Sequence, residues 1–76
     1  MEYTLDALPC GRPAVIYALV TRGAMRRRLL DLGFTPGASV ESLFCGLGGG
    51  PTAYLVRGAV IALRRGDART VYVETA

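Results

Sequence analysis

The chain contains no histidine and no lysine, and its only two cysteines lie far apart, at positions 10 and 45. A structural zinc site takes about four cysteine or histidine ligands, and iron or manganese sites combine carboxylates with imidazoles. The six acidic residues are scattered along the chain instead of being grouped. The composition therefore predicts no metal ligand set within one chain and no bound cofactor. A site formed by Cys10 and Cys45 across a subunit contact is left open.

The usual groups of enzyme chemistry are missing as well. Neither Cys10 nor Cys45 has a histidine to deprotonate it, and no Gly-x-Ser-x-Gly elbow is present. The glycine-rich stretch 46–50 is followed by Pro51 and a β-type run, whereas phosphate-binding loops end in Lys-Ser or Lys-Thr. We predict no catalytic residue and a protein that is not an enzyme.

Long apolar runs are also absent. The longest strongly apolar stretch, residues 14–20, is far too short to cross a bilayer, and residues 1–2 open no basic signal-peptide region. We therefore expect a cytoplasmic protein. In such a reducing compartment Cys10 and Cys45 are expected to be two thiols and not a disulfide.

What is present favours a small globular fold with many turns. Hydrophobic residues make up 51% of the chain, and ten glycines and four prolines divide it into short elements. At 76 residues the chain is expected to form a single domain, residues 1–76. A domain of this size buries only roughly 60% of the surface that its unfolded chain exposes.

One helix is predicted from about residue 23 to 32, with Thr21 as its N-cap. Met25, Leu29 and Leu32 recur at the four-then-three spacing of one buried helix face. Gly33 stands where a helix ends in a left-handed residue, and a helix cannot resume beyond the following proline.

The remaining pattern is of β type. Five short strands are expected, over residues 14–20, 38–45, 53–56, 59–63 and 70–74, with short helical turns over 3–8 and 64–69. Strands so short and numerous tend to curl into a small barrel, which removes sheet edges. The predicted fold class is thus mainly β: a small barrel of about five strands with one short α-helix between the first two.

The arginine triplet on the predicted helix is the most evident candidate site. Successive helical residues point roughly 100° apart, so Arg26, Arg27 and Arg28 fan around the helix. Asp31 lies within reach of the last two at i+4 and i+3. The triplet is either a solvated helix face or a docking surface. Because a rigid turn at Pro36 follows, the candidate partner-binding residues are Arg26, Arg27, Arg28, Asp31 and Pro36.

A second surface and a second ligand class stay open. Loop 46–51, together with the hairpin of strands 53–56 and 59–63, competes as a docking element. Nucleic acid is an alternative ligand, because basic side chains beside stacking aromatics bind bases and phosphates. The candidates for such stacking and contact are Tyr54, Tyr72, Arg57 and Arg69.

With its elements placed, the sequence resembles the FeoA family, the small cytosolic proteins that accompany the bacterial ferrous-iron transport GTPase. The similarity covers nearly the whole chain, in the correct order. It is carried by Leu5-x-x-Leu8 with Gly11, by the helix-to-turn segment 26–37, by Val56-Arg57-Gly58, by segment 61–64, and by Asp67-Ala68 ahead of segment 71–73.

This resemblance implies an SH3-like small β-barrel that has no catalytic activity. It implies an accessory of ferrous iron transport that binds the cytosolic domain of the membrane GTPase through protein–protein contact. No small-molecule substrate, no direct membrane insertion and no nucleic acid would then be needed, and weak self-association is left open. The alternative is a generic adaptor or a nucleic-acid-binding barrel unrelated to iron transport.

Overall fold

A computed structural model describes residues 2–43 and 50–75 of the chain. These residues form one six-stranded antiparallel sheet of order β1-β6-β2-β3-β4-β5. The strands are β1 (Glu2–Thr4), β2 (Pro13–Leu19), β3 (Ser39–Ser42), β4 (Thr52–Val56), β5 (Ala59–Leu63) and β6 (Val71–Glu74). The helices are the 3₁₀ turn η1 (Leu5–Ala7), the ten-residue α1 (Gly23–Leu32) and the four-residue α2 (Arg65–Ala68).

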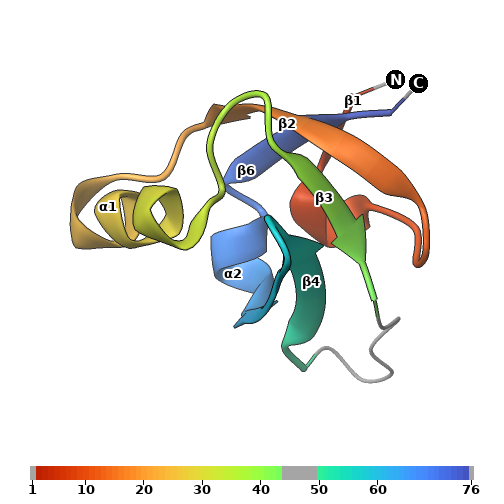
Figure 1. The fold of residues 1–76 in the computed structure, drawn as a ribbon. Coiled ribbons are helices and arrows are strands. Elements are labelled where there is room, and N and C mark those ends of the chain that lie inside the picture. Colours follow the sequence, from red (N-terminus) through yellow and green to blue (C-terminus); the bar gives the residue numbers. More distant parts are fainter. Residues whose placement is uncertain (1, 44–49, 76) are drawn as a thin grey trace.

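The sheet curls around a single core (Figure 1). Its end strands, β1 and β5, are not hydrogen-bonded to each other. The predicted class, a mainly β small barrel with one short α-helix between the first two predicted strands, is confirmed, although hydrogen bonding does not complete the ring. The sixth strand is β1, where the sequence predicted only a helical turn over residues 3–8. Tyr3 pairs with Val73 of β6, a partner seventy positions away that local sequence does not reveal.

Helix α1 begins and ends where the sequence predicts, but its cap differs. Arg22 holds the N-cap position and makes no side-chain cap hydrogen bond, so the prediction of Thr21 as N-cap is wrong. The buried Thr21 hydroxyl instead shares a hydrogen bond with the Thr70 hydroxyl at 2.6 Å. Thr21 therefore hydrogen-bonds to a residue that is distant in the sequence, and not to the first turn of α1.

The C-terminal end of α1 follows the predicted glycine stop. Gly33 has a φ of 109° and donates its N–H to the Leu30 carbonyl at 3.1 Å. The Phe34 N–H donates to the Leu29 carbonyl at 2.9 Å, which completes a Schellman motif. Leu29 and Phe34 are both fully buried, so the apolar contact that accompanies this motif is part of the core.

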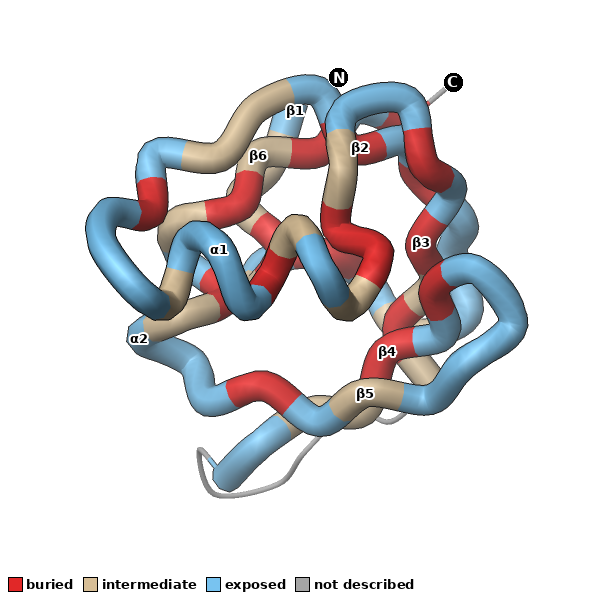
Figure 2. Tube along the Cα trace, turned by 60° about the vertical axis from the view of Figure 1, so that its left-hand side comes forward, coloured by how far each residue is buried: buried red, intermediate tan, exposed pale blue. Residues whose placement is uncertain are grey.

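The core lies between the inner face of the curled sheet and α1 (Figure 2). Alternate residues of the strands point inward, as Ala14 and Ile16 do on β2 and Val71 and Val73 on β6. From α1 only Leu29 is buried, while Met25 and Leu32 are half-buried against the core.

Cys10 is disulfide-bonded in this structure, so the prediction of a thiol at that position is wrong. The fold brings the segment before β2 against the end of β3: the Gly11 N–H donates to the Ser42 carbonyl at 2.7 Å. A prediction based on cellular compartment does not foresee which positions the fold brings together. Cys45 lies outside the described residues.

Replacing Leu29 tests the attachment of α1 to the sheet. Leu29→Ala is expected to lower the free energy of unfolding by about 2 to 5 kcal/mol, because this side chain is fully buried. Chemical denaturation measures the loss. Leu30→Ala, at a half-buried position of the same helix, is the matched control and should cost less. A loss of only a few tenths for Leu29→Ala would show that α1 does not cover the core.

Replacing Gly33 tests the helix exit. Gly33→Ala is expected to lower the free energy of unfolding by about 1 to 2 kcal/mol, because an L-residue is strained at positive φ. A Cβ there would also lie 3.0 Å from Cδ of Arg57. Gly66→Ala is the control: its Cβ would meet no atom within 4 Å, and its φ is not in the left-handed region. Equal melting of parent and Gly33→Ala would refute the proposed role of the left-handed exit.

Candidate docking surface

The structure places all five predicted partner-binding residues on α1 and the turn that follows it, and all five are exposed. Arg26 has a structural task as well. Its Nη1 donates to the Leu19 carbonyl at 2.8 Å and so ties the helix to the end of β2. Because Arg26 makes this bond within the fold, Arg27 is a better candidate for partner contact than Arg26.

The predicted ion pairs of Asp31 with Arg27 and Arg28 are not formed. Within residues 2–43 and 50–75 the one ion pair joins Arg69 Nε to Asp6 Oδ2 at 3.8 Å. Exposed pairs of long side chains gain little free energy in water, so helical spacing alone does not bring them together. Arg27 and Asp31 therefore keep their opposite charges in solvent on one helix.

The turn after α1 is held firmly to the sheet. The Ala38 N–H donates to the Thr35 carbonyl at 3.0 Å across Pro36 and Gly37, and Gly37 has a φ of 91°. A proline followed by a left-handed glycine is typical of a type II turn. The Gly37 N–H donates in turn to the Ile16 carbonyl at 2.7 Å. The exposed Pro36 is thus presented on a rigid support.

Arg57 makes a contact with the end of α1 that sequence reasoning missed, although its place in a two-residue turn was expected. It occupies the two-residue turn between β4 and β5, with a φ of 49° that is unusual for a side-chain-bearing residue. Its Nη2 donates to the Thr35 hydroxyl at 2.9 Å, and its side chain lies against Gly33. The hairpin turn therefore contacts the exit of α1. The positive φ is not visible in the sequence, since only the neighbouring Gly58 suggests a turn.

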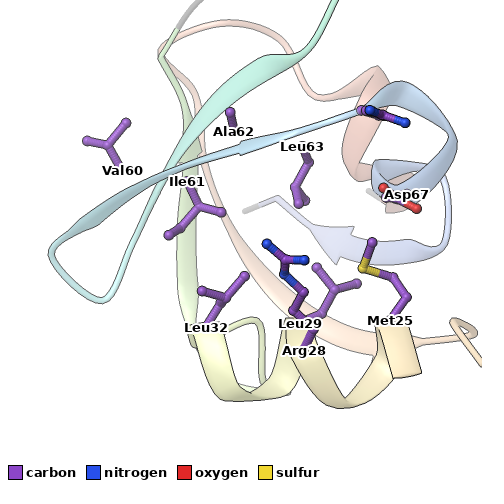
Figure 3. Close-up of a pocket in the computed structure, with 10 residues that line it drawn as sticks. Met25, Arg28, Leu29, Leu32, Val60, Ile61, Ala62, Leu63 and Asp67 are labelled. Atoms are coloured by element: carbon purple, nitrogen blue, oxygen red, sulfur yellow. The ribbon is translucent and has the colours of Figure 1, made fainter. Parts of the chain in front are cut away.

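A groove of about 580 Å³ lies between α1 and β5 (Figure 3). Its apolar part comes from Met25, Leu29 and Leu32 of the helix and from Ile61 and Leu63 of the strand. These five residues come from two segments far apart in the sequence, 25–32 and 61–63, so no local motif marks the groove.

Charged side chains border the same groove. Arg28, Arg64 and Asp67 line it, and the Arg28 side chain rises from α1 into the space below β5 (Figure 3). In the described part of the chain none of these three side chains takes part in an ion pair. The groove therefore combines an apolar floor with a positive excess at its border.

The positions of Tyr54 and Tyr72 do not support the alternative hypothesis, in which both rings stack on the bases of a nucleic acid. Tyr54 is only 2% exposed, and its hydroxyl donates to the Leu5 carbonyl at 3.3 Å. Burial raises the pKa of Tyr54 above its usual value. Tyr72 is half-buried against Tyr17, with ring centroids 6.0 Å apart. The prediction of Tyr54 as a stacking platform is wrong, because its ring belongs to the core.

The outer face of the sheet has the opposite charge. All three glutamates, Glu2, Glu41 and Glu74, lie on strands, whereas none of the nine arginines does. A hydrogen bond with Glu2 is the main reason why the pKa of the exposed Tyr17 is raised. The arginines are thus confined to helices, turns and loops.

Within the described ranges, no three His, Cys, Asp or Glu side chains are grouped so that they could hold a metal ion. The same ranges contain no helix long and apolar enough to span a bilayer.

Comparisons with protein families, curated proteins and solved structures agree with one another. The family model described as "FeoA domain" matches residues 3–75. A curated protein of Porphyromonas gingivalis (strain W83), the Fe(2+) transport protein A/Fe(2+) transporter FeoB fusion protein, is 34% identical over 70 residues. That match covers 92% of this chain but only 8% of the much longer relative.

Two solved structures share the fold over nearly their whole length. The iron uptake regulatory protein FeoA superposes with a TM-score of 0.88 at 27% identity, covering 97% of both chains. The zinc complex of Stenotrophomonas maltophilia FeoA, described as a unique procaryotic SH3 domain protein, superposes with a TM-score of 0.84 at 34% identity. It covers 95% of this chain and 89% of that one.

Ferrous iron is expected not to bind the isolated protein in a saturable one-to-one manner, because histidine is absent and the acids are dispersed. Anaerobic calorimetric titration with ferrous salt measures this. Saturable binding in the micromolar range would contradict the prediction, and a repeat under reducing conditions would then show whether thiols take part.

Proposed function

The chain belongs to the FeoA family, and on this premise we propose that it is a non-enzymatic accessory of ferrous iron transport. It acts on the cytoplasmic side of the membrane by binding the cytosolic region of the iron-transport GTPase. The whole transporter supplies the transport chemistry, and this chain supplies a folded surface.

The observation that carries the proposal is the fusion protein. There, a segment similar to this chain is part of the same polypeptide as the transporter FeoB. Covalent linkage holds two modules at a high effective concentration, which is useful when they act on each other. We infer that the separate chain reaches the same partner by non-covalent docking.

The exposed side of α1 suits such a contact. Arg27 and Asp31 stand in solvent without ion-pair partners, and Pro36 follows on a turn anchored to β2. Charges at the rim of an interface mainly tune the association rate and its salt dependence. The strands, by contrast, direct alternate side chains into the core.

Exchanging the two charges tests this surface. The double variant Arg27→Glu/Asp31→Arg keeps the net charge and places opposite charges four residues apart, so the helix should remain stable. We expect it to bind the purified cytosolic region of the cognate GTPase about three- to tenfold more weakly at low salt. Biolayer interferometry at two salt concentrations measures the change.

The matched control is Arg12→Glu/Glu41→Arg, an exchange of the same kind away from α1. It should bind as the parent does, and all variants should melt at similar temperatures. Parent-like binding of the α1 exchange variant would exclude the helix face as the docking surface. Failure of the parent itself to bind the GTPase region would refute the proposed function.

A further inference from the structure

The strand β5 presents an unpaired and unprotected edge. It is the last strand of the sheet, and in the part of the chain that the structure describes only β4 pairs with it. Natural edge strands are usually short, charged or interrupted by proline, which discourages pairing with other chains. The opposite end strand, β1, follows this rule, with three residues and Glu2. The five residues of β5, Ala59–Leu63, carry no charge and no proline.

The register shows which backbone groups lie at that edge. A two-residue turn joins β4 to β5, and Val56 pairs with Ala59 next to it. In such a hairpin the pair beside the turn is hydrogen-bonded, and hydrogen-bonded pairs alternate along the ladder. Ile61 and Leu63 therefore also bond to β4. Val60 and Ala62 direct their N–H and C=O groups to the unpaired side.

The groove lies on that same side. Val60 and Ala62 line it together with Ile61 and Leu63, although their side chains point away from α1 (Figure 3). Their backbones therefore form part of its wall. The groove is about 580 Å³ and runs between the strand and the helix, so backbone donors and acceptors stand beside an apolar floor. An added strand needs this combination: ladder hydrogen bonds, and pockets for alternate side chains.

The charged side chains at the groove favour an acidic segment over a second copy of β5 as the partner. Arg28 and Arg64 border it without ion-pair partners in the described residues, and only Asp67 opposes them. An acidic segment would complement these arginines. A second copy of β5 would not, because that strand carries no acidic residue.

We propose that the edge of β5 and the groove beside α1 bind an extended acidic segment of a partner protein as an added strand. About five residues of that segment pair with β5, with alternate apolar side chains over Met25, Leu32 and Ile61. Carboxylates of the segment meet Arg28 and Arg64. This inference rests on the proposed function only for the identity of the partner, the cytosolic region of the transporter.

The probe is a fluorescein-labelled, terminally blocked nonapeptide in which valine and glutamate alternate. Fluorescence anisotropy with the full chain should show saturable binding that weakens as salt is added. Two further peptides carry N-methyl groups on alternate backbone amides, one for each side of the strand. One of them should bind about tenfold more weakly than the parent peptide, because its ladder donors are blocked.

Ala62→Pro tests the edge from the side of the protein. The Ala62 N–H points away from β4, so proline at this edge position should leave the fold intact while it removes one donor. We expect peptide binding about tenfold weaker with unchanged melting. If this variant does not fold, the N-methylated peptides on the parent protein decide the question.

Arg28→Glu/Arg64→Glu tests the charges and should also weaken binding about tenfold at low salt. The control Arg12→Glu/Arg22→Glu changes the net charge by the same amount at exposed positions that do not line the groove. It should bind within about twofold of the parent.

Three outcomes would overturn the inference: no binding of the peptide, equal binding of both N-methylated peptides and the parent peptide, or equal loss in the two arginine double variants. Concentration-dependent dimers that Ala62→Pro abolishes, with no peptide binding, would assign the edge to a second copy instead. None of these outcomes touches the proposed function, which is tested separately by binding of the parent chain to the GTPase region.

Discussion

The left-handed turn at Gly33 is the constraint on which the rest of the surface depends. Its positive φ lets the Phe34 N–H reach back to the Leu29 carbonyl, and both side chains then enter the core. The chain leaves the helix in a single direction, toward the turn that is anchored to β2. The Arg57 side chain packs on Gly33 and binds Thr35, which holds the β4–β5 hairpin near the helix exit. The position of α1 beside β5, and with it the groove, follows from this arrangement.

The distribution of charge makes the two sides of the molecule chemically different. The three glutamates, Tyr17 and Tyr72 stand on the outer face of the sheet, while the arginines are confined to helices, turns and loops. The core uses the inward side chains of the strands. We propose that the chain acts through its surface: the exposed charges of α1, the rigid turn at Pro36, and the groove with its free strand edge. The family to which the chain belongs agrees with such a role.

Features that depend on neighbouring residues could be predicted well. The bounds of α1, the stop at Gly33 and the turn at Pro36 all depend on a few adjacent residues, and the structure has each of them. The buried position of Leu29 follows from helical spacing. The errors concern partners that are distant in the chain. Thr21 bonds to Thr70 instead of capping the helix, and Tyr54 is buried, with its hydroxyl donating to the Leu5 carbonyl, instead of presenting its ring to solvent.

The sequence by itself determined the fold class and the helix with its exit, and it singled out five residues for partner contact that the structure exposes. These properties depend on composition and on interactions within a few residues, where propensity and periodicity act. Only the tertiary structure decided that β1 pairs with β6, that β5 is an edge strand with one unpaired side among the described residues, and that Arg28 and Arg64 border one groove. Those features arise from packing between segments tens of residues apart, and the free energy of such contacts has no counterpart in any local stretch of the chain.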